Sequence, residues 1–318
     1  MYISSETRLF IREHSTDDVR TLALQSKKYP DVDMPVAITQ IAGRQIAAEK
    51  IPSWKKIEDI RYPKHLSLEQ CSSEITAYYK AGLLQGDSLT DLTGGFGVDC
   101  SFLAEKFKSV TYVERQEELC GIAAHNFHIL GLNHINVKNE DGIAHLKAMS
   151  PVDCIFLDPA RRNEHGGKAV AISDCEPDVA ALEGLLLNKA KQVMVKLSPM
   201  LDLSLALREL QQTQEVHIIS VNNECKELLL ILGQTIPPEI KIHCVNLSTK
   251  GEQEEQHFTF TREQEQCSQC NYTDSLDEYL YEPNASLLKA GAFKSLSSAF
   301  PIRKLHPNSG LFCDNGWI

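Results

Sequence analysis

The segment Asp91-Leu-Thr-Gly-Gly-Phe-Gly-Val-Asp99 carries residues whose types and spacing suit chemistry on a bound ligand. It follows an apolar run that includes Leu89 and precedes a helical pattern that includes Phe102 and Phe107. We therefore expect a strand to end at this segment and a helix to begin there. Glycines let the backbone turn tightly and approach a ligand, and the start of a helix offers unpaired N–H groups. The segment predicts a nucleotide-binding loop.

Glu114 is the second candidate, because it ends the β-rich run Val110-Thr-Tyr-Val-Glu114, 23 residues after Asp91. A doubly wound fold places at this point the acid that holds a pair of ribose hydroxyls. Glycines at 94, 95 and 97 depart from the Gly-x-Gly-x-x-Gly spacing of dehydrogenase loops. S-adenosylmethionine (SAM) fits better than NAD, because SAM has an amino group for Asp91 to attract and no pyrophosphate.

Asp141 lies in the segment Asn139-Glu-Asp-Gly142, which follows the third expected strand. Its carboxylate is placed to accept a hydrogen bond from the adenine amine of SAM. The same side chain also suits the N-cap of the next helix, and the two roles are compatible.

Asp158 and Pro159 end the apolar strand of the segment Asp153-Cys-Ile-Phe-Leu-Asp-Pro-Ala-Arg-Arg162. Proline fixes φ and has no N–H, so the carbonyls around it are held in a defined shape at the carboxyl end of the sheet. Arg161-Arg162, with Gly166-Gly167-Lys168, are expected to form a positive lip suited to a substrate phosphate. A structural salt bridge is the alternative role for these arginines.

Composition restricts the class of protein. The chain has 318 residues, with 42% hydrophobic and 24% charged residues, which is typical of a soluble globular protein. A net charge of −11 argues against indiscriminate nucleic-acid binding but allows a local basic face. No long apolar run or secretory signal is evident, and scattered cysteines indicate reduced thiols, so we expect a cytoplasmic protein with no membrane partner. Cys267 and Cys270 have zinc-ligand spacing without a second pair, so no metal is expected.

Residues 1–75 show mostly helical spacing of apolar positions, followed by a further helix over about 68–84 that leads into the first strand. Strands and helices then alternate from about 88 to 234, which indicates a parallel sheet covered on both faces. Strands are expected near 88–92, 110–114, 134–138, 152–157, 192–197, 215–221 and 227–233. Helices are expected near 97–107, 116–130, 141–147, 177–189 and 200–211. The last two strands must be antiparallel, because their link at 222–227 is too short for a crossover.

The remainder of the chain changes pattern after Pro237-Pro238. Two alternating segments, 240–247 and 257–261, predict a strand hairpin that extends the sheet or covers the core. Residues 262–275 are expected to form a linker, before a short helix at 285–296 and a strand at 301–305. The predicted domains are a helical subdomain (1–75), a SAM-binding core (76–236), a hairpin extension (237–262), and a linker with a ferredoxin-like fragment (263–318).

This layout of five βα units followed by an antiparallel pair resembles class I methyltransferases. The resemblance implies an α/β, Rossmann-like fold with a seven-stranded mixed sheet, an N-terminal helical subdomain and a small α+β C-terminal extension. Asp91, Glu114, Asp141 and Asp158 are also similar to marks of trimethylguanosine synthase-like methyltransferases. In that family the segment matching Leu66–Ile75 packs over the cofactor, which implies that Gln70, Ser72 and Ser73 neighbour SAM. Ser72 or Ser73 with Glu74 also suits a helix start.

The whole chain further resembles bacterial proteins in which such a core is followed by a ferredoxin-like piece and a THUMP-like domain. THUMP domains accompany RNA-modifying enzymes, so this resemblance implies a tRNA or rRNA substrate. The complete THUMP-like part is expected to be missing here. The sequence leaves the oligomeric state open.

Asp158 resembles the acceptor in the Asp/Asn-Pro-Pro-aromatic motif of methyltransferases that act on base amines, although Ala160 and Arg161 depart from that motif. Asp-Pro-Ala-Arg also resembles RNA 5-methyluridine methyltransferases. Those enzymes need a nucleophilic cysteine after the next strand, and residues 193–199 contain none, which disfavours C5 methylation.

The resulting hypothesis is a SAM-dependent methyltransferase that acts on an exocyclic base amine of tRNA or rRNA. Alternatives are methyl transfer to a small molecule or protein, and a nonenzymatic RNA-binding module that retains SAM. The candidate catalytic residues are Asp158, Pro159, Ala160 and Arg161. The candidate cofactor-binding residues are Gln70, Ser73, Asp91, Thr93, Gly94, Gly95, Phe96, Gly97, Glu114, Arg115, Asp141 and Gly142.

Overall fold

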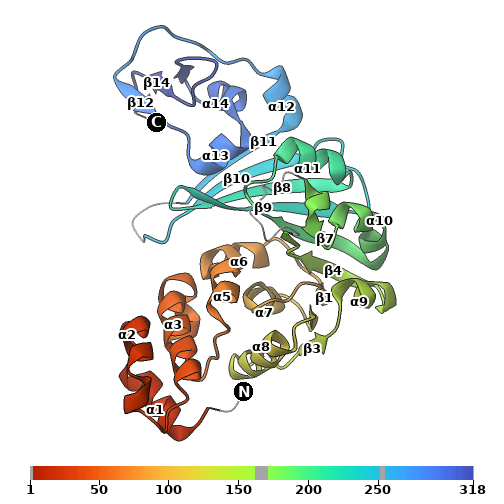
Figure 1. Ribbon diagram of the computed structural model, residues 1–318. Helices are drawn as coiled ribbons and strands as arrows, with labels where there is room; N and C mark the ends of the chain where they lie inside the picture. Colours follow the sequence, from red (N-terminus) through yellow and green to blue (C-terminus); the bar gives the residue numbers. More distant parts are fainter. Residues whose placement is uncertain (1–2, 162–170, 251–254, 318) are drawn as a thin grey trace. The chain divides into compact units, whose positions relative to one another are not determined.

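The computed structural model describes residues 3–161, 171–250 and 255–317 (Figure 1). The chain divides into two compact units, Met1–Ile155 and Phe156–Ile318.

The first unit begins with short helices that are started by side-chain caps. Helices α1 (Ser5–Glu13), α2 (Val19–Leu24) and α3 (Met34–Lys50) each follow a residue whose side chain accepts a backbone N–H of the first turn. Their buried faces meet in a small core of Phe10, Leu22, Met34, Ala37 and Ile41. Helix α4 (Pro52–Lys55) follows directly. The helical character predicted for the N-terminal part is confirmed.

The helix expected over about 68–84 is wrong as a single element. The structure has α5 (His65–Gln70) and α6 (Glu74–Ala81), with extended backbone between them. Ser72 lies in this break, and its hydroxyl donates a hydrogen bond of 2.7 Å to Asp99 Oδ2. The break follows from that contact, because a continuous helix would not leave Ser72 in the extended segment that reaches Asp99.

Parallel strands form the second half of the first unit. Strands β1 (Ser88–Asp91), β2 (Ser109–Glu114) and β3 (Ile135–Asn139) pair in the order β1-β2-β3. Helices α7 (Val98–Ala104), α8 (Glu117–Ile129) and α9 (Gly142–Ala148) follow the three strands in turn. The carboxyl ends of β1, β2 and β3 therefore lie at one edge of the sheet, where ligands bind in open α/β folds.

Strand β4 (Val152–Leu157) runs across the boundary between the two units. Its residue Asp153 binds the start of β1, because Asp153 Oδ2 accepts the N–H groups of Asp87 and Ser88 at 2.9 and 3.0 Å. Downstream, β5 (Ala160–Arg161) pairs antiparallel with β6 (Cys175–Glu176), which follows the short helix η2 (Ile172–Asp174).

The second unit contains strands in the order β11-β10-β8-β9-β7. These are β7 (Ala190–Leu197), β8 (Thr213–Val221), β9 (Glu224–Gly233), β10 (Lys241–Leu247) and β11 (Gln256–Thr261). Helices α10 (Val179–Lys189) and α11 (Leu203–Glu209) precede β7 and β8.

Strands β8 and β9 are antiparallel, as predicted. Their link is shorter than expected, because only Asn222 and Asn223 lie outside the strands. Both residues have positive φ, of 49° and 65°, which is the geometry of the tight turns that join right-twisted strands and which asparagine tolerates. The predicted hairpin of β10 and β11 is also antiparallel, and it extends the sheet because β10 pairs in parallel with β8.

Residues after β11 contain more regular structure than expected. The predicted linker contains α12 (Arg262–Cys267), which Thr261 and Gln264 start with a reciprocal capping box. The helix expected at 285–296 is two helices, α13 (Ala285–Ala290) and α14 (Phe293–Ala299). Gly291 separates them with a φ of 69°, a left-handed conformation that ends a helix. Strands β12 (Tyr279–Tyr281), β14 (Phe312–Asp314) and β13 (Arg303–Lys304) form a small antiparallel sheet.

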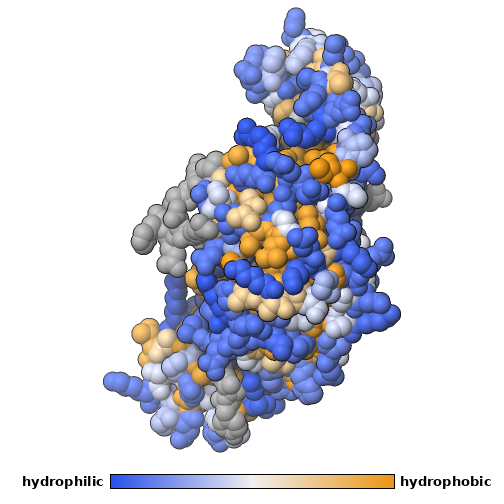
Figure 2. Space-filling view, turned by 90° about the vertical axis from the view of Figure 1, so that its right-hand side faces the viewer, coloured by the Kyte–Doolittle hydropathy of each residue, from blue (hydrophilic) through white to orange (hydrophobic). Residues whose placement is uncertain are grey.

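Within the part of the chain that the structure describes, no helix has the length and apolar character needed to span a membrane. The face drawn in Figure 2 is largely hydrophilic, with hydrophobic residues gathered near its middle.

Candidate active site

The glycine-rich loop between β1 and α7 is built around backbone conformations that side chains disfavour. Gly95 and Gly97 have φ values of +55° and +87°. Gly94 is required for a different reason, because a Cβ atom there would lie 2.2 Å from the ring of Tyr112. The Gly94 N–H donates to the Val113 carbonyl at 2.9 Å, which ties the loop to β2. The loop predicted from the sequence is therefore present and closely packed on the strand beneath it.

Asp91 ends β1 directly before this loop, and only 1% of the residue is exposed. Its Oδ1 atom accepts the N–H of Thr93 at 3.0 Å. A carboxylate held this way at the base of the loop is suited to attract an ammonium group of a ligand.

Glu114 ends β2 and binds the same loop. Glu114 Oε2 accepts the Gly95 N–H at 2.9 Å, and Oε1 accepts the Gln116 N–H at 2.8 Å. Each ionised carboxylate oxygen has a second lone-pair site, so Glu114 can also accept from ligand hydroxyls. The hydroxyl of Tyr112 donates to the Gly95 carbonyl. Burial, and then the charges of Glu114 and Asp91, raise the pKa of Tyr112, so it remains a protonated donor.

Asp141 and Gly142 bring the end of β3 to the same place. A Cβ atom at Gly142 would lie 2.3 Å from the Leu92 carbonyl oxygen, so the loops after β3 and β1 touch. Asp141 caps α9, because its Oδ1 accepts the Ala144 N–H at 2.9 Å. The cap predicted for Asp141 is thus present, and its carboxylate is exposed. The exposed Arg115 follows Glu114, and its carbonyl accepts from Asn139 Nδ2 at 3.1 Å.

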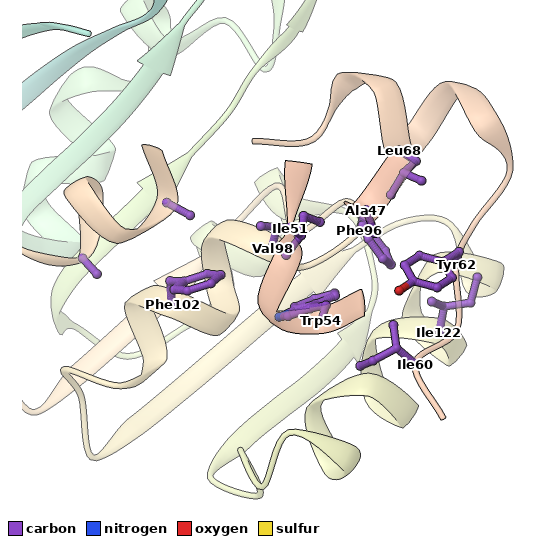
Figure 3. Packing of buried hydrophobic residues seen from close by; sticks show 12 residues of the cluster. Ala47, Ile51, Trp54, Ile60, Tyr62, Leu68, Phe96, Val98, Phe102 and Ile122 are labelled. Carbon is purple, nitrogen blue, oxygen red and sulfur yellow. The ribbon is translucent and has the colours of Figure 1, made fainter. Parts of the chain in front are cut away.

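Phe96 anchors the loop in the hydrophobic core of the first unit (Figure 3). Its ring packs edge-on against Trp54, with 5.2 Å between the ring centroids, and tilts against Tyr62 at 6.3 Å. Only 3% of Phe96 is exposed. A ligand could therefore contact the backbone of Phe96 but not its side chain.

Ser72, Lys80 and Asp99 form a buried network between α6 and α7. Lys80 Nζ lies 3.0 Å from Asp99 Oδ1 and donates to Ser72 Oγ at 3.0 Å. The side chain of Lys80 is fully buried and that of Asp99 is 11% exposed. Lys80 is not among the site residues predicted from the sequence. The available signal was a lysine among the apolar positions of a helix directly before the first strand.

The two remaining candidates of this segment have different surroundings. Ser73 is the N-cap residue of α6, and its hydroxyl lies 3.2 Å from Thr76 Oγ1. Gln70 ends α5 and is exposed. Thus Ser72 binds both members of the ion pair, whereas Ser73 occupies the N-cap position of α6 without a side-chain hydrogen bond to the first turn.

In the second unit, Asp158 follows β4 directly and forms an ion pair with a lysine that the sequence analysis did not single out. Lys196 Nζ, from β7, lies 2.6 Å from Asp158 Oδ2. The Lys196 side chain is only 10% exposed, whereas that of Asp158 is 37% exposed. The carboxylate is thus oriented by a buried cation and still accessible.

The other predicted catalytic residues surround this pair in sequence. Pro159 is buried, Ala160 is exposed, and the backbones of Ala160 and Arg161 form β5. The rest of the predicted positive lip, Arg162 with Gly166, Gly167 and Lys168, lies outside the described residues.

Cys267 is exposed and Cys270 half-buried, and neither has the ligand partners of a metal site among the described residues. Glu215, His217 and His243 do place ligand atoms within 4.8 Å of one another. The two imidazoles are stacked, however, with an interplanar angle of 13°. Because the nitrogen lone pair lies in the ring plane, nearly parallel rings direct their lone pairs side by side. This arrangement does not converge on an ion.

Parts of this chain match two protein families. Residues 37–163 match the family model of protein-L-isoaspartate(D-aspartate) O-methyltransferase, and residues 279–318 match a ferredoxin-like domain. The chain is also similar to a solved protein from Porphyromonas gingivalis W83 that is assigned as a methyltransferase. The sequence identity is 34% and the TM-score 0.85, over 100% of this chain and 80% of that one. The chain belongs to this methyltransferase family. The predicted Rossmann-like methyltransferase fold and ferredoxin-like piece are confirmed.

More distant solved structures cover about half of this methyltransferase. An rRNA methylase from Streptococcus thermophilus is 14% identical, with a TM-score of 0.36 over 50% of this chain and 93% of that one. A Streptococcus mutans protein assigned as a methyltransferase, in complex with SAH, is 12% identical, with a TM-score of 0.36 over 50% and 96%. Likeness at this level carries no argument about substrate. No curated protein matches the chain, and the THUMP-like resemblance stays a prediction.

We predict that Phe96→Ala loosens the glycine-rich loop. Emptying this buried site should lower the free energy of unfolding by about 3–5 kcal/mol, whereas Phe96→Leu should cost less because it keeps most of the apolar contact. Amide hydrogen exchange measured at Gly94 to Gly97 should accelerate in Phe96→Ala. Unchanged exchange in this loop would contradict the anchoring role.

We also predict that Lys80→Met destabilises the first unit by about 3–5 kcal/mol, because it leaves the Asp99 carboxylate buried without its cation. The double variant Lys80→Met/Asp99→Leu should recover much of this loss, since an apolar pair replaces the ion pair. Denaturant unfolding of the three proteins provides the measurement. A double variant no more stable than the single one would show that the ion pair is not the source of the loss.

Proposed function

We propose that this methyltransferase uses SAM to methylate an exocyclic base amine of tRNA or rRNA in the cytoplasm. The observation that carries the cofactor assignment is a pair of buried carboxylates that bind one glycine-rich loop: Asp91, directly before the loop, and Glu114, at the end of the neighbouring strand β2. Asp158 carries the acceptor assignment. All ten cysteines are free thiols, which supports a reducing compartment.

Three acidic residues of the first unit would hold SAM. Asp91 would attract the amino group, Glu114 would accept from the ribose hydroxyls, and Asp141 would accept from the adenine amine. The backbone at Gly95 leaves room for the ligand, because this glycine carries no Cβ and no side chain packs against the space that a Cβ would take. When bound, SAM supplies a methyl group on a sulfonium, whose sulfur leaves as a neutral thioether.

Asp158 would orient the acceptor. A base amine would donate an N–H to the carboxylate, which would hold the nitrogen lone pair in one orientation. Once the amine has taken the methyl group that SAM would supply, the Asp158 carboxylate would accept the extra proton from the nitrogen. Lys196 holds Oδ2 of that carboxylate at 2.6 Å, which fixes the orientation of the carboxylate plane.

A protein carboxylate is the second candidate acceptor, favoured by the match of residues 37–163 to an O-methyltransferase family. That match covers the cofactor half of the fold and ends shortly after Asp158. A carboxylate acceptor would face the negative charge of Asp158, offset by Lys196, whereas an amine would be attracted to it. The observed acid therefore supports an amine acceptor better than a carboxylate.

For cofactor binding, we predict that Glu114→Ala weakens SAM affinity by about 10- to 100-fold, the effect expected for loss of hydrogen bonds to a charged group. Isothermal titration calorimetry with SAM gives the affinity. Glu117→Ala is the matched control, because Glu117 is an exposed acid in the first turn of the next helix. Equal affinities for the two variants would refute the assignment of Glu114.

For acceptor chemistry, the measurement is transfer of labelled methyl from SAM to total tRNA and rRNA from cells lacking this protein, beside a protein extract from the same cells. We expect label in RNA alone, and we expect Asp158→Ala to retain SAM affinity but lose transfer by about 100-fold or more. Glu224→Gln, at an exposed ion pair in the second unit, should retain transfer. Label in protein alone, released by mild base as expected for a methyl ester, would establish the carboxylate alternative. Full transfer by Asp158→Ala would overturn the role of Asp158.

A further inference from the structure

The first unit contains a pocket lined by arginines that the cofactor loop does not use. Its volume is about 70 Å³, several times the roughly 10–15 Å³ that one water molecule needs. The arginines come from α1, α3 and the extended segment after α4. The charged lining residues are Arg8, Arg12, Arg44, Glu58, Asp59 and Arg61.

Positive charge exceeds negative charge in this pocket, since four arginines face Glu58 and Asp59. Arg8 pairs with Asp59 at 3.3 Å, and Arg44 donates to the Glu58 carbonyl at 2.7 Å. Among residues 3–161, 171–250 and 255–317, no hydrogen bond or ion pair engages the guanidinium of Arg12 or Arg61. Two guanidinium groups are thus available to an anion.

The positive charges of Arg8 and Arg61 repel one another. Burial, and then the charge of Arg8, lower the pKa of Arg61, while Asp59 opposes this shift. A guanidinium remains charged despite such a shift, so the repulsion persists and a bound anion would relieve it.

The walls of the pocket are fixed by side-chain amides that bind the backbone. Asn126 accepts the Arg61 N–H at 2.9 Å and donates to the Arg61 carbonyl at 2.8 Å. Gln40 does the same for Tyr62, with both distances 2.9 Å. Fixed backbone at Arg61 reduces the entropy lost when an anion binds.

We propose that this arginine pocket binds a phosphate group, namely a backbone phosphate of the RNA substrate; this inference rests on the proposed function. Guanidinium groups match phosphate because their planar N–H pairs donate two parallel hydrogen bonds. Tyr62 lines the pocket and also packs against Phe96 of the glycine-rich loop, so one aromatic side chain separates the pocket from that loop. A phosphate bound here would hold RNA on the unit that also contains the glycine-rich loop.

The test compares the double variant Arg12→Gln/Arg61→Gln with Arg20→Gln/Arg208→Gln in the full chain. Arg20 and Arg208 are exposed and outside the pocket, so both variants lose the same charge. RNA affinity is measured over a series of salt concentrations. The pocket variant should bind RNA about tenfold more weakly, and the slope of log K against log[salt] should fall by about 0.7–0.9, the loss of one phosphate contact. The control variant should keep most of the RNA affinity of the wild type and most of its salt dependence.

Inorganic phosphate provides a second arm, measured as thermal stabilisation of the wild-type chain and of each variant. If the two variants bind RNA equally, the RNA assignment is overturned. If, in that case, phosphate still stabilises the wild type and the control but not the pocket variant, the pocket binds free phosphate instead of RNA. If the wild-type chain neither binds nor methylates RNA, the proposed function fails, and the phosphate arm alone decides whether the pocket binds phosphate. SAM affinity should be equal in all three proteins, which separates loss of the pocket from loss of the fold.

Discussion

The attachment of the glycine-rich loop to the structure beneath it is the constraint on which the candidate site depends. Tyr112 excludes any side chain at Gly94 and binds the Gly95 carbonyl, while Glu114 binds the Gly95 N–H. Phe96 enters the core on the other side, against Trp54. Because its backbone is held from both sides, the loop presents its remaining polar groups in one arrangement. The loop therefore loses less conformational entropy when a ligand binds.

Each unit contains an ion pair between a buried lysine and an acid. Lys80 with Asp99, and Lys196 with Asp158, each bring a buried lysine to an acid at the end of a strand or the start of a helix. Such pairs add little net stability, because desolvation offsets attraction. Their effect is on geometry, since a carboxylate bound to a fixed cation cannot rotate freely. Asp158 is the more exposed acid of the two, and it is the one available to a substrate.

The sequence was sufficient for the elements whose signals are local. The strands ending at Asp91, Glu114 and Leu157, and the antiparallel pair β8 and β9, follow from apolar runs, turn residues and link lengths. The break at Ser72 and the partners of Asp99 and Asp158 were not predictable in this way. Each depends on a contact between residues distant in the chain, and the identity of Lys80 or Lys196 alone does not say which acid it meets.

A chain with a net charge of −11 can still bind a polyanion if its cations are gathered and its anions are placed elsewhere. Electrostatic attraction between exposed charges decays over about 8 Å at physiological salt, so an RNA phosphate responds to the groups within one pocket rather than to the whole chain. In the arginine pocket, the only carboxylates among the described lining residues are Glu58 and Asp59, and Arg8 occupies Asp59. Local charge, and not net charge, therefore determines whether this face attracts phosphate, and overall acidity would restrict nucleic-acid contact to such sites.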